Sequence, residues 1–314
     1  MIDQSTLTLL EHVNLNVPSH EHILSFYFDV LGCGMDPRKA SNVLPDAPKK
    51  TLWANCGASQ FHLPYGEVAQ CIPGQIGLCY ESLEGLQERL DECPHCYESY
   101  QVLPDGAIRI VDHYGNVFAC RAKPSRAEGL QPILSPPSTD TDATSQERDI
   151  ADAYGKTSTD CRGIDYVEFL CPVGTAGKIA LFYESVLDAT TSVVATNEGT
   201  SVAIIACGNI DEQGRADQSL LFRETTDPIP AYDGHHIALY VGTNRADFEQ
   251  AFKNCELAGV VWVNPRFSDK ASTLQGAKNY KQFRFKDIVD METGEKIFEL
   301  EHEMRSVEHA AYPR

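Results

Sequence analysis

The sequence has little basic charge, and this deficit limits the partners that it can bind. Lysine and arginine number 26 among 314 residues, against 45 aspartates and glutamates, which gives a net charge of −19. Binding to nucleic acid or to an anionic membrane requires a basic surface, so neither is expected as a partner. The composition, 42% apolar and 23% charged, is that of a globular protein.

Long apolar runs and a targeting segment are also missing. The first residues, MIDQSTLTLLEH, have no basic stretch followed by an apolar core, so they do not resemble a secretory signal. No stretch reaches the apolar length of a membrane helix. The 11 cysteines are an odd number, scattered singly, which is typical of a reducing compartment where cysteine serves as a small apolar residue. We therefore expect a cytoplasmic protein.

Several catalytic motifs are absent as well. There is no glycine-rich phosphate loop of Walker or Rossmann type and no Gly-x-Ser-x-Gly sequence. A single C-x-x-C motif, Cys93-Pro-His-Cys96, has the spacing of a redox motif or of half a zinc site. Because no second C-x-x-C completes a zinc site, the interpretation that we favour for this motif is a structural helix end.

What the chain does have is internal repetition. Residues 9–31 and 163–187 each read as an alternating apolar stretch, a proline and a helical stretch with a Phe-Tyr pair. Residues 74–93 and 235–255 parallel each other in the same way, as a short strand that runs into an amphipathic helix. Such self-similarity predicts repeated supersecondary units.

A biased segment separates the two halves. Residues 123–160 are rich in Pro, Ser, Thr and Asp and have few large apolar residues, so they cannot bury enough surface to offset their ordering entropy. We predict an N-terminal domain over 1–122, a flexible linker over 123–160 and a C-terminal domain over 161–314. Two domains suit a chain of this length.

Apolar periodicity and turn residues predict the same order of elements, a strand, a helix and several strands, four times. In the first half we expect strands or hairpins at 12–17, 51–57, 59–66, 75–80 and 107–122, and helices at 20–32 and 82–93. In the second half we expect strands at 166–171, 191–199, 200–208, 219–224, 235–241, 260–265, 280–290 and 296–303, and helices at 176–188 and 244–257. The pattern is that of four βαβββ modules, an α+β fold with two paired modules in each domain.

This pattern resembles the vicinal oxygen chelate superfamily, which includes glyoxalase I, extradiol dioxygenases and the fosfomycin- and bleomycin-resistance proteins. The resemblance rests on strands that open with His12 and His236 and on the endings Gly115-Asn-Val-Phe and Gly294-Glu-Lys-Ile-Phe-Glu-Leu. It implies that two modules curl around a divalent metal, whose ligands come from the first strand of each module and the last strand of the domain.

In the C-terminal half the resemblance implies a metal site. His236 opens the fourth module, and the closing strand supplies Glu299, with Glu301 on the same face. Tyr166 or Glu168 occupies the opening strand of the third module, depending on the alignment. We predict Glu168, His236 and Glu299 as ligands of Zn, Ni, Mn or Fe. The alternatives are an acidic sheet edge for the glutamates and a hydrogen-bonded strand end for His236.

The N-terminal half departs further from the superfamily pattern. His12 and Gln75 occupy the first two ligand positions, but the third falls on Ala119 or Cys120, and neither supplies a carboxylate. We therefore expect this half to hold no catalytic metal of this kind. We predict instead that His12, Asn14, His62, Gln75 and, from the third module, Tyr166 bind the substrate.

Two functional hypotheses follow from the resemblance. The first is a metal-dependent enzyme acting on a small oxygenated substrate, a glyoxalase-like lyase or isomerase before a ring-cleaving dioxygenase, in which Glu168, Glu299 and Glu301 are the catalytic carboxylates. The second is a metal-free protein that binds or sequesters a small molecule, as bleomycin-resistance proteins do. Either protein would act as a monomer or homodimer.

Overall fold

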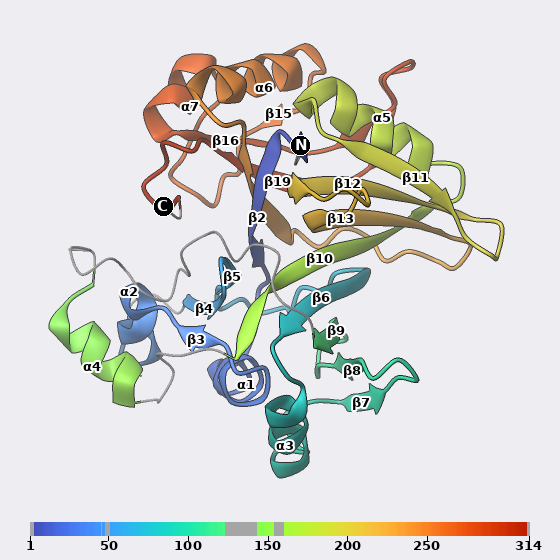
Figure 1. The fold of residues 1–314 in the computed structure, drawn as a ribbon. Coiled ribbons are helices and arrows are strands. Elements are labelled where there is room, and N and C mark those ends of the chain that lie inside the picture. Colours follow the sequence, from blue (N-terminus) through green and yellow to red (C-terminus); the bar gives the residue numbers. More distant parts are fainter. Residues whose placement is uncertain (1–2, 45, 48–50, 123–142, 154–159, 313–314) are drawn as a thin grey trace. The chain divides into compact units, whose positions relative to one another are not determined.

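The computed structural model describes residues 3–44, 46–47, 51–122, 143–153 and 160–312. These residues form two compact units (Figure 1). Unit 1 comprises residues 1–11 and 166–312, and unit 2 comprises residues 12–165 and 313–314. Two strands, β2 and β10, begin in one unit and end in the other. The boundaries of the two predicted domains stay a prediction.

The described residues form a mixed α+β structure, as predicted. Its strands are β1 (Asp3–Gln4), β2 (Leu7–Asn14), β3 (Gly34–Met35), β4 (Leu52–Cys56), β5 (Ser59–Leu63), β6 (Gly74–Tyr80), β7 (Ser99–Val102), β8 (Ile108–Val111), β9 (Val117–Ala122), β10 (Cys161–Pro172), β11 (Thr191–Ala195), β12 (Ser201–Ile210), β13 (Ala216–Thr225), β14 (His236–Val241), β15 (Val261–Trp262), β16 (Gln282–Phe285), β17 (Ile288–Val289), β18 (Lys296–Phe298) and β19 (Glu301–Arg305). Its helices are α1 (His20–His22), the π-helix η1 (Ile23–Val30), α2 (Pro37–Ala40), the 3₁₀ turn η2 (Ser41–Val43), α3 (Glu84–Glu92), α4 (Ser145–Ala153), α5 (Ala176–Leu187), α6 (Arg245–Leu257) and α7 (Leu274–Tyr280). In the described part of the chain, no helix is long and apolar enough to cross a bilayer.

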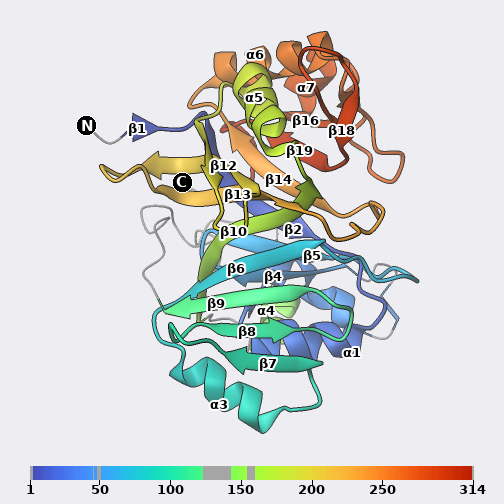
Figure 2. The same ribbon diagram turned by 90° about the vertical axis from the view of Figure 1, so that its right-hand side faces the viewer.

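The same strand order occurs four times, which confirms the predicted fold class. In each module the first strand pairs in parallel with the last, and the last pairs antiparallel with the third. The orders are β2-β5-β4-β3 and β6-β9-β8-β7 in unit 2, and β10-β13-β12-β11 and β14-β19-β16-β15 in unit 1. Figure 2 shows β6, β9, β8 and β7 side by side in this order.

Helices cover one face of the module β14-β19-β16 in unit 1, and both figures show α5, α6 and α7 together (Figures 1 and 2). Side chains of alternate strand residues point to this face and pack on the helices. The ring of Phe283 lies 5.1 Å from that of Phe252 on α6, and the ring of Phe285 lies 6.0 Å from that of Phe182 on α5. Burial of these aromatic rings leaves the opposite face of the same strands for polar residues.

Two differences from the predicted elements matter for the site. The single strand predicted over 296–303 is two strands, because β18 pairs with β17 in a separate hairpin and the chain resumes as β19. The helix α4 lies inside the segment predicted as a flexible linker, and Glu147 on it accepts a hydrogen bond from the Ser41 hydroxyl at 3.1 Å. The rest of that predicted linker, residues 123–142 and 154–159, lies outside the described residues.

Candidate metal centre

One face of the fourth module is lined by buried ionisable side chains. In the register of β14 and β19, His236 pairs with Glu301 and Ala238 with Glu303, and Arg284 on β16 pairs with Glu303. Residues that pair directly point to the same side of a sheet, so these side chains share one face. His236, Arg284, Glu301 and Glu303 are all at least 97% buried.

Arg284 is the centre of this face. Its Nε donates to Asp269 at 2.9 Å and its Nη1 to Glu301 at 2.7 Å, while its Nη2 contacts Glu303. The ring of Phe267 lies against the guanidinium at 4.3 Å. Burial alone would lower the pKa of Arg284, but the three carboxylates outweigh it and raise that pKa. The guanidinium is therefore a fixed positive charge.

A second guanidinium extends the cluster. Arg305 donates through Nε to Glu303 at 2.7 Å and through Nη1 to Glu11 at 2.8 Å. The resulting group, the Arg284 cluster, consists of Glu11, Asp269, Arg284, Glu301, Glu303 and Arg305. The cluster thus holds four carboxyl groups and two guanidiniums, more acidic groups than basic ones. Buried charge of this kind is costly unless a proton or a cation compensates it.

Glu301 is a carboxyl group of this cluster whose environment favours its protonated form. Burial raises the pKa of this carboxyl above its usual value, although Arg284 and the Asn264 amide act to lower it. The Asn264 Nδ2 donates to both carboxylate oxygens, at 3.1 and 2.9 Å. A carboxyl with a raised pKa can hold a proton at a pH where an ordinary glutamate has lost it.

His236 and Glu303 provide the position for a cation. The His236 Nε2 lies 3.7 Å from the Glu303 Oε2, too far for a hydrogen bond. Two ligands that share one ion at about 2.0–2.2 Å lie roughly 3.0–3.5 Å apart, so a small closure would bring both atoms to one metal. Imidazole with carboxylate is a donor set that suits Zn, Mn, Fe or Ni. The residues present therefore fit a divalent ion.

The predicted ligands Glu168 and Glu299 lie elsewhere in unit 1. The ligand atoms of Glu168, His236 and Glu299 are not within 4.8 Å of one another, although all three residues are described. Glu168 on β10 accepts from Arg223 on β13 at 2.9 Å. Glu299 follows β18 and precedes β19, so it lies outside the closing strand. Its carboxylate accepts a hydrogen bond from Lys286 at 2.7 Å. Hydrogen bonds from Lys286 and Lys296 lower the pKa of Glu299.

Unit 2 has a polar sheet face of its own. His12 pairs with Gln60, and Asn14 pairs with His62, so all four side chains point to one side of β2 and β5. The rings of His12 and His62 stack at 3.7 Å, and Trp53 on β4 stacks on the other side of His62 at 4.3 Å. The structure thus brings together three of the predicted substrate-binding residues, His12, Asn14 and His62.

The other two predicted substrate-binding residues lie on other strands. Gln75 lies on β6, in the second module of unit 2, and Tyr166 lies on β10 of unit 1.

The sequence reasoning missed Glu303, Arg284 and Asn264. One available signal was the alternation Glu301-His-Glu303-Met-Arg305, which puts three charged residues on one face of a strand. Nothing local marks Asn264, which reaches Glu301 from the loop after β15.

Comparison with known proteins shows the fold. No family profile and no curated protein matches the sequence. Glyoxalase I from Zea mays is similar in structure, with a TM-score of 0.55 and 12% identity over 96% of this chain and 93% of that one. A proposed dioxygenase from Bacillus subtilis matches with a TM-score of 0.53 and 13% identity over 98% of this chain and 88% of the other. The resemblance to the vicinal oxygen chelate fold that the sequence predicts is therefore confirmed.

Proposed function

We propose that this protein is a divalent-metal-dependent enzyme that acts on a small oxygenated molecule, with His236 and Glu303 as two of the metal ligands. The observation that carries the proposal is the buried imidazole–carboxylate pair of His236 and Glu303, inside a cluster in which four carboxyl groups outnumber two guanidiniums. A divalent cation beside Glu303 would add positive charge to this acidic cluster. The similarity in fold to glyoxalase I supports the proposal of a metal-dependent enzyme, but a fold does not by itself assign a reaction.

The residues around His236 and Glu303 support different roles for the carboxyl groups of Glu303 and Glu301. Arg284 and Arg305 each contact the Glu303 carboxylate, and these two guanidiniums fix its orientation. A bound divalent ion would supply Lewis-acid stabilisation of negative charge on a substrate oxygen. Glu301, whose pKa is raised by burial, is the group that would hold and return a proton.

This division of tasks favours a lyase or isomerase over a ring-cleaving dioxygenase. Glyoxalase-type chemistry moves a proton on a carbon next to a carbonyl, and it needs a carboxyl that exchanges protons near neutral pH. Glu301 has the environment for that role, with burial raising its pKa and Asn264 fixing its two oxygens. We therefore propose Glu301 as the general acid–base group, and Glu168 and Glu299 as structural ion-pair residues.

The polar face of unit 2 is by itself a second candidate ligand-binding surface. The side chain of Asn14 is 95% buried, and its Oδ1 has no hydrogen-bond partner among the described residues. A buried acceptor without a donor costs about 1–3 kcal/mol, and a ligand hydroxyl or amide would remove that cost. We propose that Asn14 binds a hydrogen-bond donor of a small-molecule ligand. His12, His62, Gln75 and Tyr166 stay predictions for the same role.

The test is the metal content of purified protein, measured by elemental mass spectrometry without chelator. We expect near-stoichiometric metal in the wild type and its loss in both His236→Ala and Glu303→Gln. Glu299→Gln and Glu168→Gln are the matched controls, because each removes a carboxylate of unit 1 that is paired with a basic side chain away from His236. Circular dichroism of each variant separates loss of metal from loss of fold.

The outcomes divide the two functional hypotheses. Zn, Ni or Mn in the wild type would support a lyase or isomerase, whereas Fe would support an oxygenase. A wild type that binds none of these ions, even after incubation with each, would overturn the metal centre and leave the metal-free binding protein. Metal that is lost in Glu299→Gln and retained in Glu303→Gln would reassign the ligands.

A further inference from the structure

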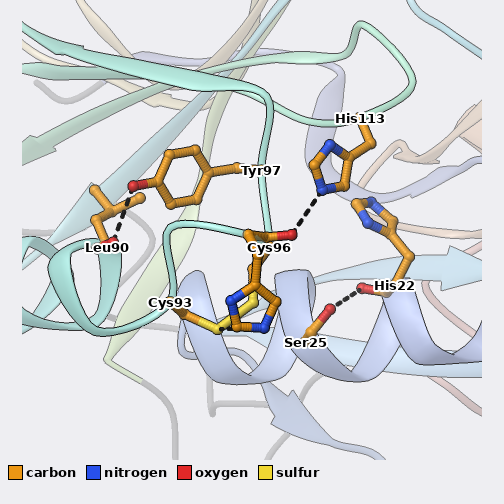
Figure 3. The surroundings of a disulfide bond; sticks show 8 residues. His22, Ser25, Leu90, Cys93, Cys96, Tyr97 and His113 are labelled. Atoms are coloured by element: carbon orange, nitrogen blue, oxygen red, sulfur yellow. Dashed lines mark hydrogen bonds between the residues drawn. A yellow bond between two sulfur atoms is a disulfide. The ribbon is translucent and has the colours of Figure 1, made fainter.

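A short turn after α3 brings three potential metal ligands together (Figure 3). The helix ends at Glu92, and the Cys93 amide still donates to the Arg89 carbonyl at 3.1 Å. The Cys96 amide then donates to the Cys93 carbonyl at 3.0 Å, which closes the turn Cys93-Pro-His-Cys96. The two cysteines are joined by a disulfide.

The donor atoms of this turn have the spacing of a chelate. The two sulfurs and a ring nitrogen of His95 all lie within 4.8 Å of one another, and the Cys93 Sγ is 3.8 Å from the His95 Nε2. In a tetrahedral zinc site with Zn–S of about 2.3 Å and Zn–N of about 2.0–2.1 Å, a sulfur and a nitrogen lie roughly 3.5 Å apart. Only the two sulfurs must separate, and reduction of the disulfide releases them.

Neighbouring groups hold the turn from both sides. The His113 Nε2 donates to the His95 carbonyl at 2.9 Å, and Figure 3 shows this imidazole directed toward the turn. On the other side the Tyr97 hydroxyl donates to the Leu90 carbonyl in α3 at 2.9 Å. Cys96 is buried and Cys93 half-buried, while His95 is exposed, so an ion can reach the donors from solvent.

The electrostatics favour a bound cation over a catalytic thiolate. Catalytic cysteines of C-x-x-C motifs commonly sit at a helix N-terminus, where the helix dipole stabilises the thiolate. Cys93 is at the C-terminal end of α3, where carbonyl groups point toward it. The exposed carboxylates of Asp91, Glu92 and Glu98 in the same segment add negative charge. This environment disfavours a free thiolate and attracts a positive ion.

We propose that the reduced protein binds one thiophilic divalent cation, of which Zn²⁺ is the type, through Cys93, His95 and Cys96. Solvent would take the fourth position. The disulfide is the closed state of the site. Its reduction takes two electrons from a phosphine, which becomes the phosphine oxide, while water supplies the oxygen of that oxide and the two protons of the new thiols. Metal binding then releases the two thiol protons. The site shares no residue with the proposed metal centre at His236 and Glu303.

The test is a Zn²⁺ titration of the full-length chain carrying His236→Ala, so that only the second site is counted. After reduction with a water-soluble phosphine we expect one equivalent of tightly bound Zn²⁺. After oxidation with diamide we expect this equivalent to be lost. Co²⁺ in place of Zn²⁺ should give a thiolate-to-cobalt absorption band, which reports sulfur ligation without any enzymatic assay.

Three variants identify the ligands. Cys93→Ser should lose the equivalent and the cobalt band, and His95→Ala should lose tight binding while keeping the same count of reactive thiols. Cys71→Ser is the control, because Cys71 is a partly exposed free cysteine of the same unit, and it should bind as the parent does. A reduced parent that binds no more Zn²⁺ than Cys93→Ser would overturn the proposal. Binding that is unchanged in His95→Ala, or that persists after oxidation, would also overturn it.

Discussion

The third and fourth modules lie in the same unit and have the same strand order, but their polar faces differ. In the fourth module the closing strand places Glu301, Glu303 and Arg305 on one face, and the neighbouring strand adds Arg284. The corresponding strand of the third module, β13, carries Ser219, Leu221 and Arg223 at its alternate positions. One topology therefore yields a buried ion cluster in the fourth module, whereas the same face of the third module carries the ion pair of Glu168 with the partly exposed Arg223.

The difference shows that the strand order fixes where a side chain points but not what it does. A first strand that runs parallel to a last strand places their side chains in register in both modules. In the fourth module this register joins His236 to a face of carboxylates. In the third, Glu168 pairs with Leu221, and its carboxylate reaches diagonally to Arg223, whose side chain is 41% exposed. Chemistry depends on which residues occupy the shared positions.

The largest difference in stability between the two modules is expected when Arg284 of the fourth module and Arg223 of the third are replaced. Arg284→Met leaves the buried carboxylates of Glu301 and Glu303 and the partly buried one of Asp269 without their shared guanidinium, and it should destabilise the protein by about 3–5 kcal/mol. Arg223→Met, the control, removes a half-exposed partner and should cost about 1 kcal/mol or less. Chemical denaturation of both variants measures the difference, and equal losses would contradict the contrast between the modules.

The two faces of β19 can be compared through its histidine. His302 points to the helix-covered face, where its Nε2 is 2.6 Å from the Tyr183 hydroxyl and its Nδ1 contacts the Leu300 carbonyl. Burial lowers the pKa of His302 to about 3. As the pH falls from about 6.5 toward 3, the unfolded chain takes up a proton there that the folded chain does not, so stability falls.

His302→Gln removes this titration and should flatten the pH dependence of stability in that window, at about 1.4 kcal/mol for each pH unit. The measurement is the free energy of unfolding at several pH values between 7 and 3 for both proteins. The wild type should lose more stability than the variant as the pH falls. Parallel curves would show that His302 is not held neutral by burial.

A smaller effect is expected from Asn264→Ala. This change removes two hydrogen bonds to the Glu301 carboxylate, which should cost about 1–3 kcal/mol where Glu301 is ionised. It should also raise the pKa of Glu301 further. A raised carboxyl pKa makes the folded state favour the protonated form, so the loss relative to wild type should grow as the pH rises above the ordinary carboxyl value of about 4.3. A loss that does not depend on pH would show that Asn264 acts only through packing.

The sequence predicted the fold well because the fold depends on patterns that repeat. Apolar alternation, helix periodicity and turn glycines recur in each module, so one error in one strand does not change the topology. The hairpin of β8 and β9 and its turn at Gly115, whose φ is +92°, were predicted at the right residues. The helix α4 was missed, since its sequence SQERDIADA offers only a narrow apolar stripe within a Pro/Ser/Thr-rich segment.

The candidate site was predicted less well because it depends on where one strand begins. His236 opens β14 as expected, but placing Glu299 on the closing strand required 296–303 to be continuous. The chain instead leaves the sheet for the β17–β18 hairpin and returns at Glu301. A residue shift of this size moves the carboxylates along the face, and no local signal reports it. Long-range partners such as Arg284 and Asn264 depend on tertiary contacts, which a single sequence does not display.

The smallest predicted effect concerns that displaced glutamate. Glu299 is 29% exposed and pairs with Lys286 and Lys296, so Glu299→Gln should destabilise the protein by about 1 kcal/mol or less. Its pKa is lowered in the fold, so the contribution is present above the unfolded pKa of about 4.3 and is lost as the pH falls through the folded value. The variant should therefore match the wild type at acid pH and fall slightly below it near neutrality. A much larger loss at neutral pH, in thermal unfolding of both proteins, would mean that Glu299 has a role that its two lysine contacts do not explain.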